Sequence, residues 1–97
     1  MNIEKEYKEK IIGILSVLFP KAKIILFGSR AQQTHVERSD IDIAVDAGYE
    51  LRPHQIGEAK AMFEVSTIPY PIDVVDMQNI PPALREQIIK DGIVWKN

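Results

Sequence analysis

Apolar residues recur at steps of three and four positions along the first part of the chain. The positions are Ile3, Tyr7, Ile11, Ile14, Leu15 and Leu18. This spacing predicts one amphipathic helix that ends before Pro20, because proline cannot continue a helix. Asn2 can accept a hydrogen bond from a free amide of the first turn, so we expect the helix to begin there.

Short aliphatic runs predict three strands. Residues 24–27 read Ile-Ile-Leu-Phe and end at a glycine, which is typical of a strand buried on both faces. Residues 41–45 read Ile-Asp-Ile-Ala-Val and predict a strand with one aliphatic face. Residues 72–75 predict a third strand, and residues 93–95 suit either a last edge strand or a docking tail.

Two further helices follow from the pattern. The first begins near Pro53 and runs to about Val65, and the second covers residues 83–90 and stops at Gly92. The order helix, strand, turn, strand, helix, strand, helix predicts an α/β (α+β) fold, a small mixed β-sheet with helices packed on it. We expect residues 1–97 to form a single domain, because the gaps between the elements have only loop length.

Composition narrows the classes of function. The chain has 97 residues and a formal charge of −2, from 12 lysines and arginines and 14 acidic residues. A protein that holds nucleic acid by its phosphates usually has a basic excess, so direct nucleic-acid binding is not expected. The absence of cysteine excludes disulfides and cysteine zinc sites and fits a cytoplasmic protein. No apolar stretch approaches the length of a membrane span, so no membrane association is expected.

Acidic residues flank or interrupt the predicted strands at Asp40, Asp42 and Asp73. Residues two apart on a strand share a face and are separated by about 6 to 7 Å, so Asp40 and Asp42 point the same way. Two aligned carboxylates repel each other unless a cation lies beside them, and Mg²⁺ suits a site made of oxygen ligands. The alternative is that these side chains are solvated on the open face of a half-covered sheet.

Asp76 competes with Asp73 for the third acidic position. Strand alternation places Asp76 on the opposite face, which favours Asp73, unless the strand ends at Val75. Asp46 is in phase with Asp42 on the second strand, but we expect it to lie in the loop that follows.

The first predicted strand is followed by Gly28, Ser29 and Arg30. Glycine permits a tight turn, serine offers a hydroxyl, and the backbone amides that open a helix attract phosphate. These residues predict a phosphate-binding turn. The alternative is an ordinary strand-to-helix turn, in which Gly28 supplies a positive φ and Ser29 caps the helix. Arg30 can contact phosphate, or form a surface ion pair with a neighbour such as Glu37.

Taken together, these motifs resemble the minimal nucleotidyltransferase domain of the DNA polymerase beta-like superfamily. The segments that carry the resemblance are residues 27–31, 39–43 and 72–76, which read Phe-Gly-Ser-Arg-Ala, Ser-Asp-Ile-Asp-Ile and Ile-Asp-Val-Val-Asp. The resemblance implies a palm-like core that transfers a nucleoside monophosphate from a Mg²⁺-bound triphosphate, expected to be ATP, to a hydroxyl. The chain departs from the pattern at Gln32 and Gln33, where relatives often have arginine and glycine.

The resemblance also implies a role for each site residue. Gly28 and Ser29 would hold the β- and γ-phosphates. Asp40 and Asp42 would ligate one or two Mg²⁺ ions that bridge the triphosphate. Asp73 would bind the second ion and help to deprotonate the acceptor. Arg30 would contact phosphate or the acceptor.

The same resemblance suggests a partner. It implies the antitoxin of a two-gene pair, whose acceptor is a tyrosine on a HEPN-domain toxin. The alternative is a non-catalytic antitoxin module that masks its toxin by docking, through residues 80–84 and 93–95, and the chain can also form an oligomer. The residues leave the nucleobase and the identity of the acceptor open.

Overall fold

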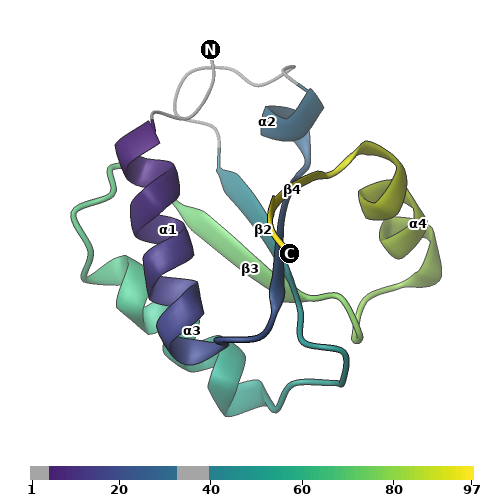
Figure 1. Cartoon of the computed structure of the whole chain (residues 1–97), viewed down its shortest axis with the longest axis horizontal. Coiled ribbons are helices and arrows are strands. Elements are labelled where there is room, and N and C mark those ends of the chain that lie inside the picture. Colours follow the sequence, from purple (N-terminus) through teal and green to yellow (C-terminus); the bar gives the residue numbers. More distant parts are fainter. Residues whose placement is uncertain (1–4, 33–39) are drawn as a thin grey trace.

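The computed structural model describes residues 5–32 and 40–97, and across them one β-sheet forms the centre of the fold (Figure 1). The elements in chain order are α1 (Lys5–Leu18), β1 (Lys23–Phe27), α2 (Ser29–Gln32), β2 (Ile41–Asp46), α3 (Pro53–Glu64), β3 (Ile72–Asp76), α4 (Pro82–Asp91) and β4 (Ile93–Lys96). Within these ranges the sheet has four strands in the order β3-β2-β1-β4. β1 is antiparallel to β2 and β4, whereas β2 and β3 are parallel. The predicted fold class is therefore confirmed.

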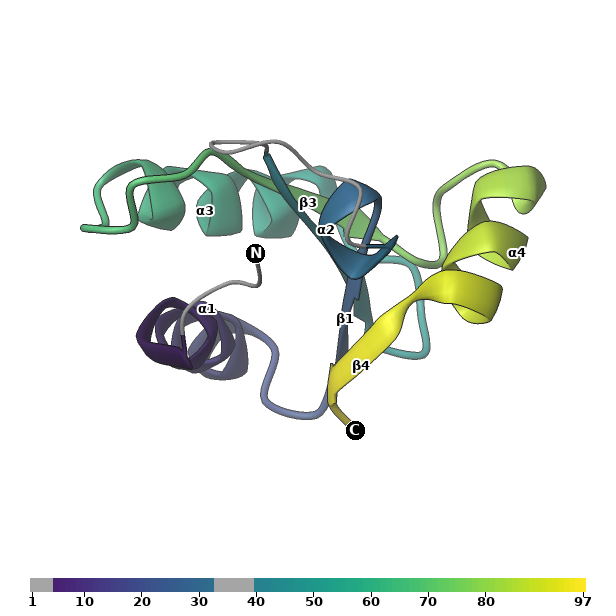
Figure 2. The same ribbon diagram turned by 90° about the horizontal axis from the view of Figure 1, so that it is seen from above.

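Helices cover both faces of the sheet, α1 and α3 on one side and α4 on the other (Figure 2). Alternate strand residues divide between two buried clusters. The cluster beneath α1 and α3 takes the strand residues Ile24, Leu26, Ile41, Ile43, Val45 and Val74. The smaller cluster joins Ile25 and Ala44 to Ile88 of α4. Because β1 is buried on both sides, the prediction made for its aliphatic run is confirmed.

The connection from β2 to β3 decides where the acidic residues lie. α3 links these two parallel strands, and Pro53 begins it at a position where proline costs no hydrogen bond. The register places Asp42 beside Asp73 and Val45 beside Asp76. Because the two strands run in the same direction, the first acidic residue of each lies at the same end of the sheet.

The last segment forms an edge strand, the first of the two predicted possibilities. β4 pairs with β1, and Gly92 connects α4 to β4. A Cβ at Gly92 would lie 2.5 Å from the carbonyl oxygen of Ile88 and 2.7 Å from Cγ2 of Ile25. Glycine is needed there because no side chain fits between α4 and β1.

Element boundaries differ from the prediction in small ways. Asp46 is not a loop residue, since it pairs with Lys23 as the last residue of β2. The aliphatic pattern missed this pair because both of its members are charged. α3 ends at Glu64, and the predicted helix start at Asn2 lies outside the described residues. Of the helices described, none is long and apolar enough to cross a membrane.

Candidate functional site

Several chain segments meet at one end of the sheet, next to α2 (Figure 1). β1 ends there, whereas β2 and β3 begin there, because β1 is antiparallel to β2 and β3 is parallel to it. The register pairs Phe27 with Asp42, and Asp42 with Asp73. The fold thus brings the Gly28 turn, Asp42 and Asp73 to one end of the sheet, with Asp40 directly before β2.

Asp42 lies in the middle of this edge. It is in phase with Ala44, so its side chain is on the face of the sheet that α4 covers farther along. Burial raises the pKa of the Asp42 carboxyl above its ordinary value of 3.8, and the nearby charges of Asp73 and Asp40 raise it further. The three carboxylates therefore repel one another in the charged state, and a bound cation would relieve that repulsion.

Gly28 approaches Asp42 more closely than any other residue type could. Its φ is +77°, in the region that favours glycine. A Cβ on Gly28 would collide with Oδ2 of Asp42. The turn is therefore built with its backbone directly against the central carboxylate, so a phosphate bound to the turn would lie beside Asp42.

α2 begins at Ser29, immediately after this glycine. The amide of Gln32 donates a hydrogen bond to the carbonyl of Gly28 (3.2 Å), which closes the short helix. Arg30 differs from the other predicted site residues because it is only 6% exposed, with its guanidinium over the ring of Tyr70. Glu37, the neighbour considered as an ion-pair partner of Arg30, lies outside the described residues.

Asp73 and Asp40 are more exposed than Asp42. The Asp73 side chain is 52% exposed, and its Oδ1 lies 3.9 Å from Nζ of Lys60 on α3. Asp40 is exposed where the chain enters β2. Both carboxylates are therefore open to an incoming ligand.

The donors at this edge suit Mg²⁺, although within residues 5–32 and 40–97 no group of three acidic or histidine side chains is assembled to hold a metal by itself. Mg²⁺ is commonly bound by one or two carboxylates together with substrate phosphates and water. The carboxylates of Asp42 and Asp73, which are neighbours in register, match that requirement. Burial raises the pKa of Asp42 most, and the repulsion from Asp73 and Asp40 that adds to it would be relieved by a cation. The residues present thus fit the metal as part of a nucleotide complex.

Asp76 has a different role from Asp73. It is 6% exposed, and its carboxylate accepts hydrogen bonds from the amides of Leu51 (2.7 Å) and Gln78 (3.0 Å). Its position beside Val45 places it on the face of α1 and α3. Asp76 therefore holds the loop before α3 and lies away from the candidate site.

Sequence patterns did not identify two neighbours of the site, Lys60 and Tyr70. Lys60 falls on a predicted helix among other scattered charges, and its proximity to Asp73 depends on how α3 packs beside β3. Tyr70 lies between Pro69 and Pro71, and this pattern predicts only a loop. The local signal that could have indicated Tyr70 is its position three residues before Asp73.

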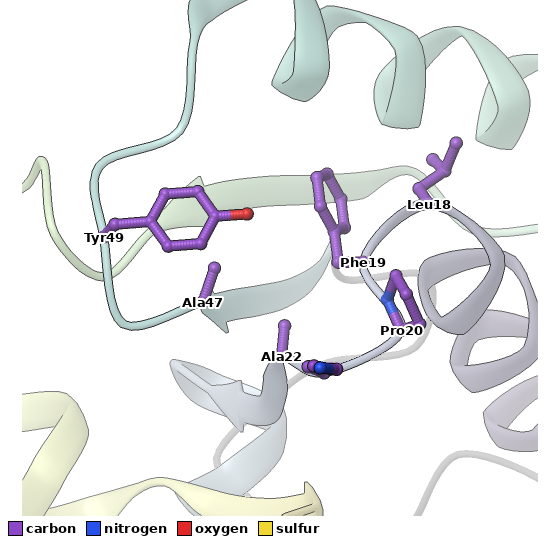
Figure 3. Close-up of a pocket in the computed structure, with 7 residues that line it drawn as sticks. Leu18, Phe19, Pro20, Ala22, Ala47 and Tyr49 are labelled. Atoms are coloured by element: carbon purple, nitrogen blue, oxygen red, sulfur yellow. The ribbon is translucent and has the colours of Figure 1, made fainter.

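An apolar pocket lies at the opposite end of the sheet (Figure 3). The residues labelled there are Leu18, Phe19, Pro20, Ala22, Ala47 and Tyr49. They come from the end of α1, the segment before β1 and the loop after β2. The length of β2 separates this pocket from Asp42, and its lining includes none of the predicted site residues.

Comparison with known proteins gives a consistent family. Residues 9–96 match the family model described as polymerase beta, nucleotidyltransferase. The chain is 36% identical over 86 residues to the protein adenylyltransferase MntA of Shewanella oneidensis, covering 88% of this chain and 61% of MntA. It is 32% identical over 101 residues to a Methanocaldococcus jannaschii protein named as a candidate protein adenylyltransferase, covering 96% of this chain and 97% of that protein.

A solved structure has the same fold. It is a complex of a tri-AMPylated Shewanella oneidensis HEPN toxin with an MNT antitoxin, and the match has a TM-score of 0.76 at 29% identity. The match covers 96% of this chain and 71% of the other. The chain spans less than two thirds of the Shewanella MntA and nearly all of the archaeal relative. Since the family model extends over nearly the whole sequence and the archaeal relative aligns end to end, the chain belongs to the polymerase beta nucleotidyltransferase family.

Proposed function

We propose that the protein is a Mg²⁺-dependent adenylyltransferase that moves AMP from ATP to a hydroxyl. The observation that carries this proposal is the contact of the Gly28 turn with Asp42, in register with Asp73. A phosphate-binding turn placed directly against paired carboxylates suits a metal-bound triphosphate. The names of the two relatives support AMP as the transferred group.

Each site residue has a role in this proposal. Gly28 and Ser29 would bind the β- and γ-phosphates with backbone amides and a hydroxyl. Asp40, Asp42 and Asp73 would hold one or two Mg²⁺ ions, which when bound neutralise phosphate charge and favour departure of the leaving group. Arg30 belongs to the same turn.

The transfer itself breaks a phosphoanhydride bond of ATP and forms a phosphoester bond to the acceptor. The acceptor oxygen forms a bond to the α-phosphorus, the bond between the α- and β-phosphates breaks, and pyrophosphate leaves. Asp73 is exposed and lies beside Asp42. We therefore propose that its carboxylate takes the proton from the acceptor hydroxyl and also contacts the metal. The chain's remaining contribution is to align the acceptor with the phosphorus, which phosphoryl transfer requires above all.

The acceptor in this proposal is a tyrosine of a HEPN-domain partner, whose modification makes the protein an antitoxin. Support comes from the solved complex, whose HEPN toxin is AMPylated and bound to an MNT antitoxin. The net charge of −2 also favours a protein acceptor over a nucleic acid. The use of ATP would place the reaction in the cytoplasm.

Intact mass measurement tests this proposal directly. The protein would be incubated with Mg²⁺, labelled ATP and the candidate HEPN partner, and both chains weighed. We expect the partner to gain the mass of one or more AMP groups. The double variant Asp40→Asn, Asp42→Asn should lose this transfer, whereas Asp46→Asn, the same change at the far end of β2, should keep it.

The result also separates the enzyme from a docking module. If the double variant still transfers AMP, the assignment of these carboxylates is wrong. If the wild type binds and silences the partner without any mass change, the protein acts by masking instead.

A further inference from the structure

The side chain of Arg30 is held by an aromatic stack. Its guanidinium carbon lies 4.6 Å from the centroid of the Tyr70 ring, and the residue is 6% exposed. Attraction between a guanidinium and a ring face is stronger when water is excluded from the pair. Tyr70 also meets Tyr7 of α1 edge-on, with 5.8 Å between centroids and 83° between the ring planes. The ring thus contacts both Arg30 of α2 and Tyr7 of α1.

The backbone that carries Tyr70 is also constrained. Pro69 and Pro71 flank it, and each proline fixes its own φ and restricts the residue before it. The carbonyl of Pro71 accepts a hydrogen bond from the amide of Ile41 (2.9 Å). This bond ties the Tyr70 segment to the first residue of β2, between Asp40 and Asp42.

Tyr70 therefore connects all the segments that carry predicted site residues. Through Arg30 it contacts α2, which begins at Ser29. Through Pro71 it is bonded to the start of β2, and along the chain it precedes Asp73 of β3 by three residues. A shift of the ring would change the distance between the phosphate-binding turn and the carboxylates.

We propose that Tyr70 is a positioning residue that sets the phosphate-binding turn at the correct distance from Asp42 and Asp73. Arg30 then acts on the phosphates through the turn that it anchors. This inference rests on the proposed function, since it assumes that the turn and the carboxylates bind one triphosphate. It predicts that the ring of Tyr70 controls ATP affinity, whereas its hydroxyl does not.

Hydrogen exchange tests the anchoring without any nucleotide. The amide of Gln32 donates to the carbonyl of Gly28, so its exchange rate reports on the turn. In Tyr70→Leu, which removes the ring but keeps an apolar side chain, we expect this amide to exchange about tenfold faster. Tyr70→Phe should exchange like the wild type. Tyr49→Leu is the matched control, because Tyr49 is 62% exposed at the far end of the sheet.

Calorimetry with ATP and Mg²⁺ tests the functional consequence. Tyr70→Leu should weaken ATP binding by about tenfold with little change in kcat, because the turn binds phosphate without taking part in bond breaking. Tyr70→Phe should bind within about twofold of the wild type. Should Tyr70→Leu fail to fold, Arg30→Met and Arg30→Lys would test the same contact, with lysine preserving the cation over the ring.

Two outcomes would overturn the inference. One is a folded Tyr70→Leu protein with wild-type exchange at Gln32 and wild-type ATP affinity. The other is a Tyr70→Phe protein as impaired as Tyr70→Leu, since the ring alone should suffice. A wild type that does not bind ATP at all would refute the proposed function, whereas the exchange rates would still decide whether Tyr70 holds the turn.

Discussion

Each end of the paired strands β2 and β3 carries two aspartates, but the environments of the two pairs differ. At one end Asp42 and Asp73 lie side by side, and the pKa of Asp42 is raised by burial and by the neighbouring carboxylates. At the other end Asp46 accepts hydrogen bonds from Gly48 and Gln78, and Asp76 from Leu51 and Gln78. The fold thus supplies hydrogen-bond donors to the second pair and places like charges beside Asp42 in the first.

This contrast shows that burial alone does not indicate a functional carboxylate. Asp76 is the most buried of the four aspartates, yet its partners are amides of the same chain. Asp42 is less buried but lies among like charges and against a glycine turn. The environment, rather than the depth, distinguishes the hydrogen-bonded Asp76 from Asp42, which is proposed to bind a ligand.

The largest expected effect on stability comes from Asp76→Ala. It removes a charged acceptor from two backbone amides and leaves the buried N–H of Leu51 without that partner, which should cost about 2 to 4 kcal/mol. Asp73→Ala should change stability by less than about 0.5 kcal/mol, because its side chain is half exposed. Urea unfolding measures both, and equal losses would contradict the contrast between the two ends.

Gly28→Ala should have the next largest effect. The positive φ and the collision with Oδ2 of Asp42 together should cost about 2 to 3 kcal/mol and disrupt ATP binding. Gly48→Ala is the matched control, because Gly48 has a φ of +84° but open space around its Cβ position. It should lose only about 1 kcal/mol. Thermal unfolding of the two variants would isolate the close approach, and identical losses would argue against it.

Asp42→Asn should slightly stabilise the free protein while removing the proposed transfer. Because the pKa of Asp42 is higher in the folded state than in the unfolded chain, the wild type loses stability as pH rises through that raised value. The melting temperature of the variant should therefore exceed that of the wild type near neutral pH.

The higher melting temperature of the variant should disappear below pH 3.8, the ordinary pKa of aspartate, because the wild-type Asp42 is then neutral like the asparagine. Melting curves across this pH range would measure it. Asp46→Asn should give no gain, since its carboxylate accepts hydrogen bonds from the fold. If the difference in melting temperature between Asp42→Asn and the wild type grew as the pH fell, the expected sign would be wrong.

Lys60→Met should have the smallest effect. The ion pair with Asp73 is half exposed and 3.9 Å long, so its loss should change stability by less than about 0.5 kcal/mol. Removing this competing cation should modestly tighten Mn²⁺ binding in the presence of ATP, measured by electron paramagnetic resonance. Lys5→Met, which breaks the exposed pair with Glu9 on α1, should leave Mn²⁺ binding unchanged.

Local patterns predicted much of the fold and the polar end of the sheet. The aliphatic runs gave the strands, because burial on one or both faces leaves a direct trace in residue order. The Gly28 turn and the strand aspartates were identifiable because each motif is short and contiguous. The resemblance to polymerase beta-like nucleotidyltransferases is confirmed, whereas the individual roles of Asp40, Asp42 and Asp73 remain predictions.

Contacts between distant segments left no such trace. Arg30 and Tyr70 are forty positions apart, and the burial of Arg30 depends on how α2 meets the loop before β3. The pair formed by Lys60 and Asp73 depends in the same way on the packing of α3. Periodicity reports which face of an element is buried, but not which side chain of another element covers it.

The pairing of β4 with β1 has a consequence for how the protein is made. β1 is complete early in translation, but its second neighbour is supplied by Ile93–Lys96. Until those residues leave the ribosome, one edge of an apolar strand has free backbone groups that can pair with other chains. The nascent protein would then be most vulnerable to aggregation just before its synthesis reaches β4, and a chain shortened before Ile93 should remain in that vulnerable state.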